Sequence, residues 1–360
     1  MWKSLSIALA ASLAIVGMSD AASRTPHGRP RAEVAADGVF AAFARRPIVL
    51  LGDAHHLAQE GAFYAALIRD PRFAAEVGNL VAEFGGAAHQ DTIDRYVNGE
   101  AVSYQELRKV WTDLVGWEAP PSQMYSNLFA TVRAVNARLP PPRRIRVWLG
   151  EPPIDWTTLR SFDDLDPYMR RRDTYPADLI NRDVLDRGRK ALVIYGPPHF
   201  LFSPFGPSMR DSVERAHPGS TYLILPYAGY ARAGCSQQVE SRARAWAAPA
   251  LVRPVTGTWL ARVMIRCAAT GGFRSPDPAQ VARARTALSG ASADALLYLG
   301  PAATLTRDAP DQSLYLDSAY VAEWNRTRSC CLPPEVATIH PDKVLREATG
   351  GRQRYDGPSP

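Results

Sequence analysis

Four short apolar runs recur along the chain, and each leads into glycine together with an acidic or histidine residue. They occupy residues 47–51, 79–86, 145–151 and 191–199. Apolar runs of this length that end in turn residues predict strands buried in a sheet. In open α/β sheets the loops at the carboxyl ends of the strands form the ligand crevice. The ends of these four runs are therefore where we expect functional side chains.

The intervening segments have helical spacing of apolar residues, and more strands follow the fourth run. Helices are predicted at 58–69, 163–189 and 317–328, and strands at 221–226, at 293–300 and around Val252 and Val263. Alternating strands and helices predict an α/β fold with a mainly parallel sheet flanked by helices.

One segment of this pattern, residues 87–139, is a long helical insertion interrupted near Gly99 and Gly116. It could form a cap over the strand ends. The predicted single α/β domain spans residues 37–330.

The two ends of the chain have other compositions. Residues 1–21 begin with Met1-Trp2-Lys3, continue with an apolar run and end in small residues, which is typical of a secretory signal peptide. An uncleaved membrane anchor is the alternative. We expect residues 22–36 to be a flexible lead-in and residues 331–360 a partly disordered C-terminal extension. The predicted location is periplasmic or secreted, with no stable membrane span after cleavage.

Export permits disulfide bonds, and the sequence has four cysteines. Cys235 and Cys267 are isolated in sequence and are expected to pair. Cys330 and Cys331 could form a vicinal bridge, pair crosswise with the other two, or stay reduced.

The net charge of +6 comes mostly from scattered arginines, and no aromatic-interleaved basic stretch accompanies them, so we expect no nucleic-acid partner. A serine elbow of the Gly-x-Ser-x-Gly kind, a Gly-x-Gly-x-x-Gly loop and a Walker loop are all missing from the sequence. The usual serine hydrolase and nucleotide-binding classes are therefore disfavoured. A small-molecule or peptide substrate is expected.

Histidines and carboxylates gather at the predicted strand ends. Of the seven histidines, three directly follow apolar runs. Imidazole and carboxylate groups together can hold a divalent metal that activates water, or can transfer protons themselves. The candidate catalytic residues are Asp53, His55, His56, Glu83, Glu151 and His199.

Within this set, His55, Glu83 and His199 would make a three-ligand metal site with an open position for water. Asp53 and Glu151 are candidates for supporting or proton-transfer roles. The structural alternative is that these histidines cap helices and that the carboxylates pair with arginines.

Two Gly-x-x-His elements, Gly52-Asp53-Ala54-His55 and Gly196-Pro197-Pro198-His199, flank the strand that contains Glu83. This arrangement resembles the superfamily of erythromycin esterases, ChaN-like haem-binding proteins and TraB/Tiki proteases. The resemblance implies an α/β fold with its site at the strand ends. It matches His55 and His199 to the motif histidines and Glu83 to the motif carboxylate. Asp53 stands where many members carry glutamate, and esterase-like members place their histidine one residue later, at the position of His56.

The expected function is an exported hydrolase that activates water with histidine and Glu83, with or without a divalent metal, against an ester or amide bond. A different class, implied by the ChaN-like resemblance, is a haem- or metal-binding protein without turnover. In that case His55, His56, His199 or Tyr298 would be the axial ligand. A third alternative is a relative that keeps the fold and has lost the activity.

Overall fold

The computed structural model describes residues 29–116, 121–229, 233–267, 278–287, 292–349 and 353–355. The predicted signal peptide at 1–21 lies outside them. The strands are β1 (Arg31–Val34), β2 (Ile48–Gly52), β3 (Asn79–Gly86), β4 (Arg146–Glu151), β5 (Ala191–Tyr195), β6 (Thr221–Tyr227), β7 (Ala250–Arg253) and β8 (Ala295–Tyr298).

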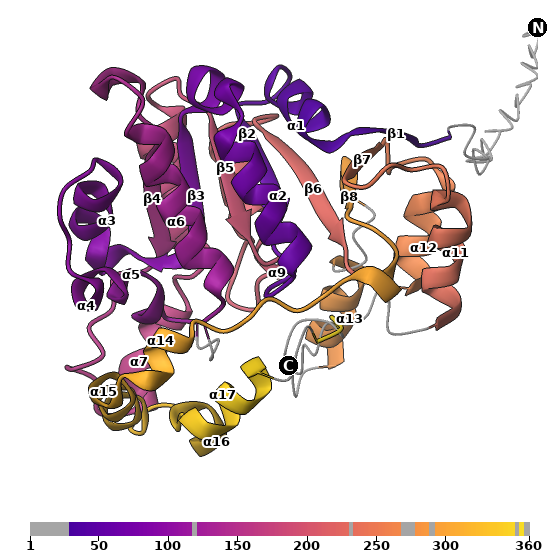
Figure 1. Cartoon of the computed structure of the whole chain (residues 1–360). Helices are drawn as coiled ribbons and strands as arrows, with labels where there is room; N and C mark the ends of the chain where they lie inside the picture. The colour runs from indigo at the N-terminus through magenta and orange to yellow at the C-terminus, as the bar shows by residue number, and fades with distance from the viewer. Residues whose placement is uncertain are drawn as a thin grey trace, which may run out of the picture.

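Helices connect nearly all of these strands (Figure 1). They are α1 (Ala35–Phe43), α2 (Ala58–Arg69), α3 (Gln90–Val97), α4 (Tyr104–Leu107), α5 (Lys109–Thr112), α6 (Gln123–Asn136), α7 (Phe162–Met169), α8 (Thr174–Leu179), α9 (Pro198–Leu201), α10 (Met209–Ala216), α11 (Ala233–Ala243), α12 (Trp259–Cys267), α13 (Pro278–Ala287), α14 (Gln312–Leu316), α15 (Ser318–Arg328), α16 (Pro334–Ala337) and α17 (Pro341–Thr349). The segments η1 (Phe73–Val77) and η4 (Ile180–Leu185) are π-helical.

The described strands form one eight-stranded sheet in the order β1-β7-β8-β6-β2-β5-β3-β4. Its neighbours from β8 to β4 are parallel, and β7 runs antiparallel to both β8 and β1. The predicted α/β class with a mainly parallel sheet is therefore confirmed. Because β2, β5, β3 and β4 are consecutive and parallel, their carboxyl ends lie at one edge of the sheet.

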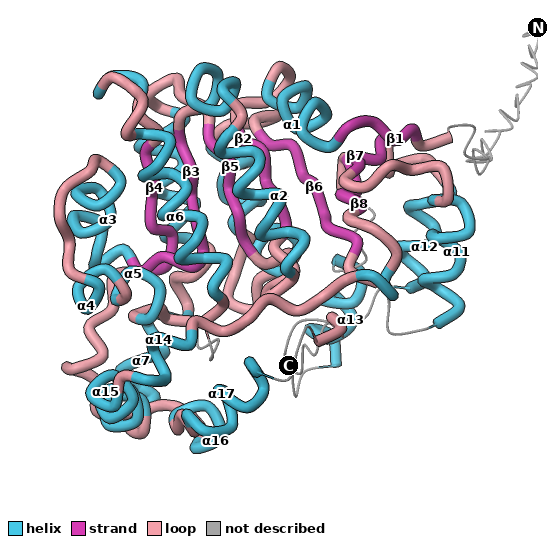
Figure 2. The backbone as a smooth tube through the Cα atoms, in the orientation of Figure 1, coloured by secondary structure: helices cyan, strands magenta, loops and turns pink. Residues whose placement is uncertain are grey.

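Both faces of the sheet are covered, as the alternation of side chains along β2 illustrates. Val49 and Leu51 belong to the core that α1, α2 and α6 complete, and Ile48 and Leu50 belong to the core on the other face. Figure 2 shows α2 and α6 lying in front of the strands. Burial of both faces explains why these strands read as continuous apolar runs.

Two sequence expectations differ from the structure. The strand expected around Val263 is part of helix α12, because buried Leu260, Val263, Met264 and Cys267 have the i, i+3, i+4, i+7 spacing of a helix face. The expected flexible lead-in contains β1, which pairs with β7, and Glu33 on β1 forms an ion pair with Arg253.

The cysteines form two disulfides. Cys235 on α11 is bonded to Cys267 on α12 with a Cα–Cα distance of 5.8 Å, which confirms the expected pair. Cys330 and Cys331 form the vicinal bridge, one of the three alternatives.

The helical insertion at 87–139 is the connection from β3 to β4. Its longest helix, α6, packs on α2 against the sheet, as Figure 1 shows. In the C-terminal extension, α16 and α17 are helical, and Tyr355 donates a hydrogen bond to the carbonyl of Ala54 at 3.0 Å. In the part of the chain that the structure describes, no helix is both long and apolar enough to cross a membrane.

Candidate active site

The turn after β2 holds an aspartate and a histidine in direct contact. His55 Nδ1 lies 2.8 Å from Asp53 Oδ2, and Asp53 is buried. Two tyrosines also donate to this carboxylate, Tyr125 to Oδ2 at 2.9 Å and Tyr64 to Oδ1 at 3.0 Å. Since a carboxylate only accepts hydrogen bonds, the proton of a neutral His55 ring is on Nδ1, and Nε2 has the lone pair of a base.

His56 has a different environment from His55. Its backbone has a φ of 66°, a left-handed conformation that non-glycine residues seldom adopt, and its side chain is buried. Its carbonyl accepts a hydrogen bond from the backbone of Asp308 at 2.7 Å. Of the two adjacent histidines, His55 is the one that lines the pocket described below.

Glu83 on β3 is buried and contacts two cationic side chains, Arg172 and His199. Its Oε1 lies 2.9 Å from Arg172 Nη2 and 3.1 Å from His199 Nε2, and its Oε2 accepts a hydrogen bond from the backbone of Gly196. Burial alone would raise the pKa of Glu83, but His199, Arg172 and, when it is protonated, His55 hold that pKa well below its usual range. Glu83 is therefore a stable anion and a weak base.

His199 is held between two carboxylates. Besides the contact of its Nε2 with Glu83, its Nδ1 lies 2.8 Å from Asp173 Oδ1. Burial alone would lower the pKa of His199, but Glu83 and Asp173 raise it to about 9. At neutral pH His199 is therefore an imidazolium with both ring nitrogens donating.

Glu151 at the end of β4 shares Arg172 with Glu83. Its Oε1 lies 2.7 Å from Arg172 Nη2, and its Oε2 accepts from the backbone of Gly116 at 3.3 Å. Burial raises the pKa of Glu151 although Arg172 acts in the opposite direction.

The two halves of the site meet at Gly196, directly after β5. A Cβ atom at this position would lie 2.9 Å from His55 Nε2 and 3.3 Å from Glu83 Oε2. That first distance is shorter than an ordinary carbon–nitrogen contact. The glycine therefore allows the ring of His55 and the carboxylate of Glu83 to approach the same stretch of backbone.

These residues border a small pocket with about 30 Å³ of space for a water-sized molecule, which is the volume of roughly one water. Its lining combines apolar and polar side chains. The apolar side chains are Phe84, Trp111, Leu114 and Pro121, and the polar ones are His55, Glu83, Tyr125, Glu151 and Arg172. The insertion at 87–139 supplies Trp111, Leu114, Pro121 and Tyr125, so it does cover the strand ends at this place.

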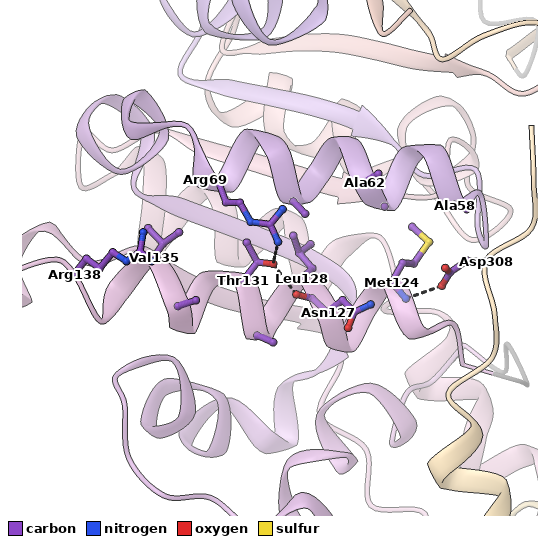
Figure 3. A pocket seen from close by; sticks show the side chains of 14 residues that line it. Ala58, Ala62, Arg69, Met124, Asn127, Leu128, Thr131, Val135, Arg138 and Asp308 are labelled. Carbon is purple, nitrogen blue, oxygen red and sulfur yellow. Dashed lines mark hydrogen bonds between the residues drawn. The ribbon is translucent and has the colours of Figure 1, made fainter.

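A larger hollow of about 680 Å³ lies between α2 and α6 (Figure 3). Small side chains line most of it, and its charged residues Arg69, Arg138 and Asp308 lie at separate points along it. It brings no candidate catalytic residues together.

The structure brings together five of the six predicted residues, Asp53, His55, Glu83, Glu151 and His199, whereas His56 is buried and is not among the residues that line the pocket. The candidate residues from the sequence do not include Tyr64, Tyr125, Arg172 or Asp173. Tyr125 stacks on Phe84 with ring centroids 4.1 Å apart, and its hydroxyl donates a hydrogen bond to Asp53. The one available signal was the position of Arg172 and Asp173 at the end of a basic run, between two predicted strands.

Comparisons with known proteins give weak likenesses. No family model matches the sequence, and no curated protein matches it. A solved structure of the type III effector HopBA1 is similar at 13% identity with a TM-score of 0.36, over 58% of this chain and 90% of that one. A solved structure of a Bacillus cereus protein is similar at 13% identity with a TM-score of 0.35, over 56% of this chain and 70% of that one.

Proposed function

We propose that the protein is an exported hydrolase in which His55 takes a proton from water so that the water attacks an ester or amide carbonyl. The observation that carries this proposal is the 2.8 Å hydrogen bond between His55 Nδ1 and buried Asp53 Oδ2. An aspartate behind a histidine fixes the tautomer and ring orientation that general-base catalysis needs. The motifs around His55 and His199 and their resemblance to the erythromycin esterase superfamily support the same reaction class.

The reaction proceeds in two steps. A water proton moves to His55 Nε2 while the water oxygen bonds to the carbonyl carbon, giving a tetrahedral oxyanion. When the oxyanion collapses, the bond to the alkoxide or amine breaks, and His55 returns its proton to that leaving group. Asp53 stabilises the imidazolium that exists between the two steps.

Cations beside the pocket favour the oxyanion. Arg172 lines the pocket, and His199 is charged at neutral pH because its pKa is raised to about 9. Positive charge that is fixed in advance near a developing oxyanion lowers the barrier. Because the lowered pKa of Glu83 makes it a weak base, we assign it the role of anchoring these two cations.

The metal-dependent version of the reaction fits these residues poorly. It would use His55, Glu83 and His199 as ligands, but the Oε1 atom of Glu83 already contacts two cationic groups that would repel a metal ion. Within the described ranges no group of three or more His, Cys, Asp or Glu side chains is arranged to hold a metal ion. The proposed mechanism therefore uses His55 without a metal.

The haem-binding alternative stays a prediction without a supporting contact. Both ring nitrogens of His199 lie within hydrogen-bonding distance of carboxylates. Tyr298 packs against Tyr227 and Trp246 in the core on the face of the sheet opposite α2 and α6.

The test is turnover of a panel of p-nitrophenyl esters of increasing acyl length and the matching anilides. Wild-type protein should hydrolyse at least one ester, and His55→Ala and Glu83→Gln should lower the rate about 100-fold or more. His217→Ala is the matched control, because His217 forms a histidine–carboxylate pair with Asp186 away from the pocket. Full turnover by both His55→Ala and Glu83→Gln, with folding intact, would overturn the proposal.

A further inference from the structure

Residues 305–311, which we call the strap, follow β8 and cross the carboxyl-end edge of the sheet toward α14 (Figure 1). The first half of the strap holds the turn that contains the catalytic histidine. The backbone of Asp308 donates to the carbonyl of His56 at 2.7 Å, and Ala58 donates to the carbonyl of Thr306 at 3.0 Å. The position of His55 within its turn thus depends on a segment about 250 residues later in the chain.

The second half of the strap holds the N-terminus of α6. Asp308 Oδ2 accepts from the backbone N–H of Met124 at 2.7 Å (Figure 3). It also accepts from the hydroxyl of Ser122 at 2.5 Å. The N–H of Gln123 donates to the carbonyl of Ala309 at 2.9 Å. The first turn of a helix has N–H groups without intrahelical partners and a partial positive charge, so a carboxylate stabilises it. Asp308 therefore caps α6 from a distant part of the chain.

Helix α6 carries Tyr125, the residue directly after the capped Met124. The Tyr125 hydroxyl donates to Asp53 Oδ2 at 2.9 Å and lies 3.3 Å from His55 Nδ1. The helix has little freedom here, since a Cβ atom at Gly61 of α2 would lie only 2.6 Å from the Cβ of Met124. Asp308 thus contacts both the turn after β2, through His56, and the start of α6, through Met124. The relative position of these two segments sets the hydrogen bond from Tyr125 to Asp53.

We propose that Asp308 is a positioning residue for the reaction. Its backbone fixes the turn of His55, its carboxylate fixes the start of α6, and it acts on the His55–Asp53 pair through Tyr125. This inference rests on the proposed hydrolase function.

A double-mutant cycle of Asp308 and Tyr125 tests the positioning role, with kcat for the best ester as the readout. Asp308→Ala should lower kcat about 10-fold with little change in KM, which is the effect expected when one hydrogen bond to the His55–Asp53 pair is lost. Asp308→Asn should restore most of the rate, because its amide oxygen can still accept from Met124. In a Tyr125→Phe background, Asp308→Ala should cause no further loss, because both changes remove the same hydrogen bond.

Asp317→Ala is the matched control. Asp317 caps α15 through the N–H groups of Ala319 and Tyr320 and also pairs with Arg108, so this variant loses a helix cap and an ion pair and should keep kcat. If Asp308→Ala does not fold, Asp308→Glu replaces it in the cycle, since its longer side chain keeps the charge and displaces the cap. If the loss of kcat in the double variant equals the product of the losses in Asp308→Ala and Tyr125→Phe, the two residues act independently and the positioning role is overturned. Full activity of His55→Ala would instead overturn the hydrolase proposal itself.

Discussion

The Nδ1 atom of His55 and the Oδ2 atom of Asp53 are 2.8 Å apart, and the Asp53 side chain is fully buried. Asp53→Asn should lower kcat about 1,000-fold, because an amide that donates to Nδ1 favours the tautomer whose Nε2 is protonated and cannot act as a base. Steady-state kinetics with the best ester measures this. A rate within a few-fold of wild type would show that Asp53 does not set the tautomer.

Arg172 neutralises two buried carboxylates, Glu83 and Glu151. Arg172→Met should lower the free energy of unfolding by about 3–5 kcal/mol, because it removes the cation that pairs with buried Glu151 and leaves buried Glu83 with His199 alone. Urea unfolding measures the change. Arg182→Met is the control, since Arg182 pairs with Asp183 at the exposed surface and should change stability little. Equal effects of the two substitutions would contradict the role of Arg172.

His199 should make stability fall at alkaline pH. Its folded-state pKa is raised from 6.5 to about 9, so its contribution is complete below pH 6.5 and is lost as the pH rises to 9. This loss amounts to about 3 kcal/mol. The difference in unfolding free energy between wild type and His199→Gln should therefore shrink by that amount over this range, and a difference independent of pH would refute the ion pair.

Glu60 is a buried carboxyl under the active-site turn, where its Oε2 accepts from the N–H of Ala54 at 2.7 Å. Burial and the nearby Asp53 raise the pKa of Glu60 well above its ordinary value. Its contribution to stability is therefore complete below about pH 4.5 and declines as the pH rises toward the folded-state pKa.

The difference in unfolding free energy between wild type and Glu60→Gln should therefore decrease as the pH rises above about 4.5. Glu214→Gln should show the opposite sign, because the folded-state pKa of Glu214 is lowered and its contribution is lost as the pH falls below about 4.5. Parallel curves for the two variants would contradict the raised pKa of Glu60.

The strands could be predicted from the sequence because both faces of the sheet are buried, so each strand is a continuous apolar run. The candidate residues could be predicted because they lie at the ends of those runs. Val263 was misassigned to a strand because short apolar segments fit either period. Tyr125 lies on helix α6 and Arg172 lies in the turn between α7 and α8, and both residue types also have ordinary packing and surface roles. The strap could not be predicted, since most of its contacts are backbone hydrogen bonds, which any residue type can make.

Export is predicted from residues 1–21 alone. Amino-terminal sequencing of protein recovered from the periplasm or medium should find a start near residue 22. An intact Met1 on all exported material would show that the signal is not cleaved.

The central claim is that His55 activates water without a metal, and ester hydrolysis after dialysis against a strong chelator tests it most directly. Metal content is determined on the same samples of wild type, His55→Ala and His217→Ala. We predict full turnover by metal-depleted wild type and His217→Ala, and a rate about 100-fold or more lower for His55→Ala. Loss of wild-type turnover on chelation, with recovery on adding a divalent metal, would contradict the account and support a metal-bound water.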